Sequence, residues 1–183
     1  LKSLSVSGYQ VVFTTHSPQM VSIDSIADTL IIRKAPARGT YCLPTIREAV
    51  EKTIVEARHQ AETLFEFQNA AQVLFSERVL LMEGKTEHRL LPLIARLQGY
   101  AAPGEGAIAL VPLHGSPNIP KALAVLRALG IPARAVADLD FAFRVAIPLG
   151  WVDPASVDVQ RCKEILRDLH DRGLISLDND GYP

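Results

Sequence analysis

Two short motifs contain the carboxylates on which a reaction of this chain would depend. Glu83 and Glu87 lie in MEGKTE, and Asp138 and Asp140 lie in ADLD. Carboxylates that are packed together at neutral pH repel one another, so a protein must protonate some of them or hold cations between them. Ligands that offer only oxygen favour Mg²⁺ or Mn²⁺ over zinc. The four acids are therefore candidate metal ligands and catalytic residues if the fold brings them together.

The chain from residue 78 onward alternates between strand and helix patterns. Short connections between such elements give right-handed crossovers and a parallel sheet with helices on both faces. The pattern therefore predicts an α/β fold with a Rossmann-like sheet. Strands are expected at 78–83, 107–113 and 133–140, and helices at 86–98, 119–129 and 154–172. The first helix has Leu90, Leu91, Ile94 and Leu97 on one side, and the last has a buried face of Cys162, Ile165, Leu166 and Leu169.

This sheet would bring the two acidic motifs to one edge. Ligands of open parallel sheets bind beyond the carboxyl ends of the strands. Glu83 ends the first expected strand, while Asp138 and Asp140 end the third, where alternation would put both on the same face. Glu87 lies in the first turn of the next helix, where the helix dipole favours a negative charge. We therefore expect the four carboxylates to converge, although each motif alone is also typical of a helix cap or a solvated loop.

Residues near these acids could bind a phosphate. A side chain at Gly84 would obstruct a tight turn or the approach of a phosphate, and Lys85 carries a positive charge beside it. His114, Gly115 and Ser116 follow the second expected strand, so backbone N–H groups and a hydroxyl could reach the same edge. An ordinary loop with a helix cap explains the second group equally well.

The first part of the chain has a different pattern. A strand is expected at 11–15 and a hairpin from 29–33 to 41–46. Residues 47–76 lack glycine and proline and carry a stripe of apolar residues, which predicts one long helix or two. A linker or a dimerisation segment explains this stripe better than a cofactor site.

Composition excludes several classes of protein. The 183 residues include 19 basic and 20 acidic ones, so DNA binding would have to rely on local patches. No apolar run approaches the roughly 18 residues of a membrane span, and the start does not resemble a signal peptide. Cys42 and Cys162 stand far apart, which suits the reducing cytoplasm. Because the first residue is not methionine, we expect a piece of a longer protein.

The motifs together resemble a known family. MEGKTE followed by ADLD is similar to the Toprim domain of topoisomerases, bacterial primases and several nucleases. VVFTTHSPQMV resembles the switch-histidine loop of ABC-type ATPases, with His16 where the terminal phosphate is sensed. An ABC-type ATPase tail that leads into a Toprim domain resembles the OLD (overcoming lysogenisation defect) family of ATP-dependent endonucleases. The resemblance extends from about Tyr9 to Asp140.

This resemblance implies an organisation and an activity. Residues 1–46 would be the tail of the ATPase domain, 47–77 a helical linker or dimerisation segment, and 78–183 a Toprim nuclease domain with a C-terminal helix. The implied reaction is cleavage of DNA with two Mg²⁺ or Mn²⁺ ions held by Glu83, Glu87, Asp138 and Asp140. DNA is the implied partner, with a possible homodimer and no membrane. ATP would act only through the missing ATPase region, by way of His16.

The sequence departs from the family at one position and leaves alternatives open. Some relatives have a third acid two residues beyond the pair, where this chain has Ala142. A later acid would then complete a second metal site, and a lysine would stabilise the transition state. The candidates are Asp153, Asp158 and Glu164 for the acid and Lys163 for the lysine, for which a solvated helix face is the commoner explanation.

Two other functions use the same fold. A topoisomerase or primase relative would need a nucleophilic tyrosine or a polymerising partner, and none of the four tyrosines has supporting sequence context. A non-catalytic Toprim module would serve as a DNA-binding or assembly platform in recombination or repair. Concentrated negative charge argues against a platform because it repels DNA phosphates.

We predict that the 183-residue chain does not hydrolyse ATP by itself. A phosphate loop of the form GxxxxGK[ST] is missing from its sequence, so nothing in it can cradle the nucleotide phosphates. Phosphate release from ATP with Mg²⁺ should equal the buffer blank. Sustained turnover by the purified chain would contradict this prediction.

Overall fold

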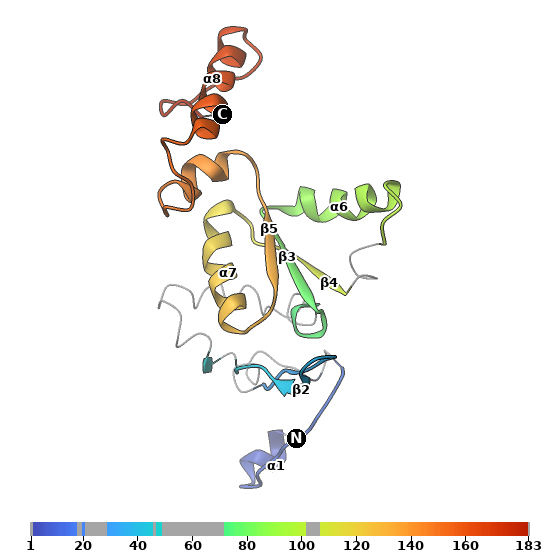
Figure 1. The fold of residues 1–183 in the computed structure, drawn as a ribbon. Coiled ribbons are helices and arrows are strands. Elements are labelled where there is room, and N and C mark those ends of the chain that lie inside the picture. Colours follow the sequence, from blue (N-terminus) through green and yellow to red (C-terminus); the bar gives the residue numbers. More distant parts are fainter. Residues whose placement is uncertain are drawn as a thin grey trace.

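The computed structural model describes residues 2–17, 20, 29–45, 47–48, 72–101 and 107–182 (Figure 1). Most of the helix expected over 47–76 lies outside the described residues, although 47–48 and 72–75 at its two ends are helical. Within the described part, none of the helices combines the length and the apolar character that crossing a membrane requires.

A three-stranded parallel sheet forms the centre of the structure. Its strands are β3 (Arg78–Met82), β4 (Ile108–Pro112) and β5 (Ala133–Val136), in the order β4-β3-β5. Met82 pairs with both Pro112 and Val136, so the three strands end level with one another. The predicted α/β fold with a parallel sheet is confirmed, and the residues that follow these strands share one edge.

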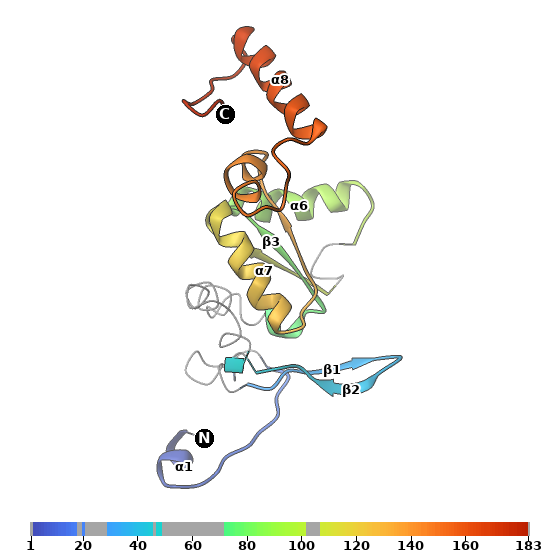
Figure 2. The same ribbon diagram turned by 60° about the vertical axis from the view of Figure 1, so that its left-hand side comes forward.

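Two helices connect the strands and lie on opposite sides of the sheet (Figure 2). The helix α7 (Ile119–Ala128), which follows the short 3₁₀ turn η3 (Ser116–Asn118), packs beside β5 and buries Ala122, Val125 and Leu126. The helix α6 (Lys85–Leu97) contacts β3 and β4 but has no buried residue among those described. Its apolar side is open, with Leu97 84% exposed.

The third strand is shorter than the sequence pattern predicted. We expected β5 to continue to Asp140, but it ends at Val136. Beyond this point β3 and β4 have also ended, so a longer β5 would have no ladder partner among the described residues. The chain turns instead, and the N–H of Phe141 donates to the carbonyl of Asp138 at 3.1 Å. The prediction that strand alternation places Asp138 and Asp140 on one face is therefore wrong.

The N-terminal part contains the expected hairpin but not the expected strand. After α1 (Lys2–Val6), residues 11–15 form no strand with any described residue. β1 (Ile32–Ala35) and β2 (Gly39–Cys42) pair antiparallel, as predicted. Ile31 and Leu43, next to these strands, are buried in the same core as β3, β4 and α7. The hairpin is thus anchored to the core of the sheet.

A second, smaller core lies after the sheet. It joins the π-helix η4 (Ala142–Ala146) to α8 (Val157–Asp171) through Phe143, Val159 and Leu166, with Tyr182 of the C-terminal segment packed against them. Of the face predicted to be buried in α8, Leu166 is buried whereas Ile165 is exposed. Ser156 caps this helix by accepting a hydrogen bond from the N–H of Val159.

The fold predicts that Leu81 is essential for stability. Leu81 is fully buried in the central strand, so Leu81→Ala should lower the free energy of unfolding by about 2–5 kcal/mol. The matched control is Leu93→Ala in α6, where the side chain is 55% exposed and the change should stay within about 0.5 kcal/mol. Urea unfolding followed by circular dichroism measures both. An equal loss of unfolding free energy in the two variants would contradict the burial of Leu81 and the exposure of Leu93.

Candidate active site

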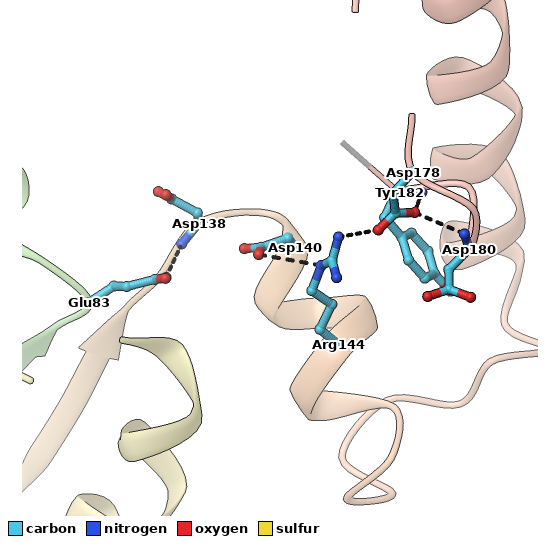
Figure 3. A network of polar contacts seen from close by, with 7 residues as sticks. All are labelled: Glu83, Asp138, Asp140, Arg144, Asp178, Asp180 and Tyr182. Atoms are coloured by element: carbon cyan, nitrogen blue, oxygen red, sulfur yellow. Dashed lines mark hydrogen bonds and ion pairs between the residues drawn. The ribbon is translucent and has the colours of Figure 1, made fainter. Parts of the chain in front are cut away.

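A hydrogen bond joins the two acidic motifs across the sheet edge. Glu83 directly follows β3, and its Oε2 accepts the N–H of Asp138 at 3.2 Å, although the residues are 55 positions apart (Figure 3). The level ends of β3 and β5 make this contact possible. The Glu83 oxygen thus faces the backbone of Asp138 rather than its carboxylate (Figure 3).

Glu87 points back over the same edge, as its place in the first helical turn predicted. Its Oε2 accepts the N–H of Gly84 at 2.9 Å and so satisfies one of the free donors at the start of α6. A Cβ atom at position 84 would lie 3.2 Å from this oxygen, closer than most such contacts. Glycine therefore lets the carboxylate approach the backbone that follows Glu83.

The two aspartates lie in the turn between β5 and η4. Asp138 is exposed, whereas Asp140 is partly buried at the start of the helical segment. Arg144, one helical turn later, places its Nε 3.7 Å from Asp140 Oδ2. Asp140 Oδ1 is buried and has no hydrogen-bond partner among the described residues.

Arg144 also binds an acid that the sequence did not single out. Its Nη2 donates to Oδ2 of Asp178 in the C-terminal segment (Figure 3). The spacing of Asp140 and Arg144, four positions apart, is a sequence signal for an ion pair on a helix. Asp178 had no such signal, since its position depends on the path of the chain after α8.

Glu83, Glu87 and the backbone of Asp138 come together at one edge of the sheet, but the four predicted ligands do not form an assembled metal site in the described structure. The described residues contain no group of three His, Cys, Asp or Glu side chains close enough to hold an ion. Glu83 and Glu87 instead accept backbone N–H groups, and Asp140 lies beside Arg144. The donors still fit a hard divalent cation, because all are carboxylate oxygens and Asp140 Oδ1 has no other partner.

The residues predicted to bind phosphate lie next to Glu83. The N–H of Gly115 donates to the carbonyl of Glu83 at 3.0 Å, which holds the loop after β4 against the acidic edge. His114 and Gly115 both have positive φ angles, 56° and 138°, and His114 is exposed. Lys85 is exposed at the start of α6, while Ser116 is buried.

The remaining candidates lie elsewhere in the described chain. His16 is exposed between α1 and β1. Asp153 accepts the N–H of Ala155 at 2.8 Å and so stabilises the turn before α8. Asp158 and Glu164 are exposed on α8, where Lys163 lies 6.0 Å from the centre of the Tyr182 ring.

Asp178 is the described carboxylate whose environment clearly favours its ionised form. The N–H of Tyr182 has the largest effect, joined by Arg144 and the N–H of Asp180, and together they hold the pKa of Asp178 below its ordinary value of 3.8. A lower pKa in the folded state means that these contacts contribute stability above pH 3.8. The contribution is lost as the pH falls through the folded-state pKa.

We predict that the carboxyl carbon of Asp178 titrates with a midpoint below 3.8 in an NMR titration. In Arg144→Met the midpoint should rise yet remain below this value, because the N–H of Tyr182 still stabilises the anion. A midpoint at or above 3.8 in the unmodified chain would show that the C-terminal contacts do not form in solution.

Comparison with known proteins identifies relatives of this part of the chain. Residues 74–140 match the family model described as overcoming lysogenization defect protein-like, TOPRIM domain, and all four acids lie within the match. The Old nuclease of Escherichia phage P2 is 36% identical over 142 residues, which are 77% of this chain and 24% of that protein. The chain thus spans about a quarter of the length of this relative. Residues 74–140 are therefore a Toprim domain of the OLD-like family.

Proposed function

We propose that this chain is the nuclease region of an ATP-regulated OLD-family protein and cleaves DNA with Mg²⁺ or Mn²⁺. The observation that carries the proposal is the 3.2 Å hydrogen bond from the Asp138 N–H to Glu83, which places both acidic motifs at one sheet edge. The likeness to a protein named as a nuclease supports the choice of reaction.

Glu83, Glu87, Asp138 and Asp140 would hold the ions. Two divalent ions, when bound, supply activation of the attacking water and stabilisation of the leaving oxygen. The protein's part is to orient the carboxylates. The N–H groups of Asp138 and Gly84 do this for Glu83 and Glu87, because each donates a hydrogen bond to one carboxylate oxygen.

The loop after β4 and the start of α6 would position the DNA backbone. Lys85 and His114 are exposed in the two segments next to Glu83, where positive charge and hydrogen-bond donors can contact phosphate oxygens. Gly84 and Gly115 keep the backbone at this edge uncovered. The side chain of Ser116 is buried, so Ser116 would contribute to phosphate binding by its position at the start of η3.

The proposed organisation follows the family resemblance. Residues 1–46 would be the tail of an ABC-type ATPase domain, in which His16 senses the nucleotide once the rest of that domain is present. Residues 47–77 would be a helical linker or a segment through which a homodimer forms, and residues 78–183 would be the Toprim nuclease domain with a C-terminal helix. DNA is the proposed partner, and the cytoplasm is the proposed location.

We predict that the chain nicks or linearises supercoiled plasmid when Mg²⁺ or Mn²⁺ is present. Asp138→Ala should lower the rate by about a hundredfold or more, because even outer-shell partners of metal sites cost about ten- to a hundredfold. Gel electrophoresis of plasmid after timed incubation measures the rate, and EDTA should abolish it.

Asp168→Asn is the matched control. Asp168 is an exposed aspartate of α8 that pairs with Arg172, so its loss changes the charge equally but leaves the sheet edge intact. This variant should cut like the unmodified chain. Plasmid that stays supercoiled with both the unmodified chain and Asp138→Ala would favour a non-catalytic platform that binds DNA.

A further inference from the structure

Arg144 lies between two carboxylates and donates a hydrogen bond to only one of them. An aspartate and an arginine four positions apart on a helix form a favourable ion pair, so Asp140 is the expected partner. Its Oδ2 lies 3.7 Å from Arg144 Nε, which exceeds hydrogen-bond distance, while Nη2 donates to Asp178. The guanidinium is thus directed toward the C-terminal segment, and Asp140 makes only a looser ion pair with it (Figure 3).

The loop that holds Arg144 is built around the Asp178 carboxylate. Oδ1 of Asp178 accepts the N–H groups of Asp180 and Tyr182, both at 3.0 Å, which leaves Oδ2 for Arg144. The N–H of Asp178 donates to the carbonyl of Tyr182 at 2.7 Å and closes the loop. We call residues 178–182 the C-terminal loop.

Aromatic contacts fix this loop on the same helical segment as Arg144. The Tyr182 ring stacks on Phe143 with 4.8 Å between the ring centres. Arg144 lies 6.0 Å from the centre of the Tyr182 ring, within reach of a cation–π interaction. The loop therefore offers the guanidinium both a carboxylate and an aromatic face.

We propose that the C-terminal loop draws Arg144 away from Asp140 and thereby keeps the Asp140 carboxylate available to a divalent cation. This inference rests on the proposed function, in which Asp140 is a metal ligand. Asp178 is a positioning residue in this scheme, since it acts through Arg144. If Asp178 lost its charge, Asp140 would be the acid paired with Arg144 on the same helical segment. Arg144 would then form a hydrogen-bonded ion pair with Asp140. The arginine would then compete with the metal.

The role of the C-terminal loop can be tested by measuring how tightly the 183-residue chain binds Mn²⁺. The electron paramagnetic resonance signal of free Mn²⁺ reports the unbound fraction. Asp178→Asn keeps an oxygen that can accept the two loop N–H groups but removes the charge that holds Arg144. Its Mn²⁺ affinity should fall about threefold to tenfold, between the effects expected for exposed and for buried ion pairs. Adding Arg144→Met should restore the affinity, because the competing cation is then gone.

The double variant separates competition from damage to the fold. If Asp178→Asn merely loosened the structure, removal of Arg144 would not rescue it, and an unrescued loss would overturn the proposal. Asp168→Asn removes an aspartate from another Asp–Arg pair, on α8, and should leave Mn²⁺ affinity unchanged. Circular dichroism checks that each variant is folded.

The outcomes also separate this inference from the proposed function. An unmodified chain that binds no Mn²⁺ would overturn both. An unmodified chain that binds Mn²⁺ and cuts plasmid, together with unchanged affinity in Asp178→Asn, would overturn only the role of the C-terminal loop. Loss in Asp178→Asn with recovery in the double variant is the expected result.

Discussion

Carboxylates that gather at one edge of a sheet repel one another, and each must find a donor or a cation. Glu83 accepts a backbone N–H from the neighbouring strand end, and Glu87 accepts one from the start of its own helix. Asp140 has an arginine beside it and one buried oxygen without a hydrogen-bond partner in the described structure. The edge therefore has its negative charge partly compensated by protein groups.

The register of the sheet makes this concentration of charge possible. Met82 is level with Pro112 and Val136, so residues from three separate segments emerge side by side. Behind them, the buried side chains of β3, β4 and α7 fix the strand ends, since close-packed cores resist displacement. Packing of the hydrophobic core thus offsets the electrostatic repulsion between the acids, because the acids cannot move apart unless the strands shift.

Hydrophobic patterning predicted the buried strands correctly. It failed to predict the end of β5, which depends on hydrogen bonds to neighbouring strands. β3 and β4 lie within a residue or two of their expected bounds, because their apolar runs can only be buried in a sheet. The end of β5 was wrong because a strand continues only while a neighbour offers hydrogen bonds, and Leu139 and Phe141 look equally suited to a strand.

The same limit applies to the site. The convergence of Glu83 with Asp138 followed from the topology of a parallel sheet, which the sequence encodes as alternating strands and helices. The contact of Arg144 with Asp178 spans 34 positions and joins a helix to a loop, so no periodic pattern in the sequence predicts it. Such contacts depend on how α8 packs on η4, which only the tertiary structure reveals.

Asp140 lies where the chain passes from one core to the other, because Phe141 packs against the first core and Ala142 against the second. Glu83 and Asp138 follow strands of the sheet and Glu87 lies in α6, whereas Arg144 and Asp178 lie in η4 and in the C-terminal segment, next to Phe143 and Tyr182 of the second core. The family match ends at residue 140, so both groups that set the charge around Asp140 lie beyond it. The charge around Asp140 is therefore set by residues that the acidic motifs do not include.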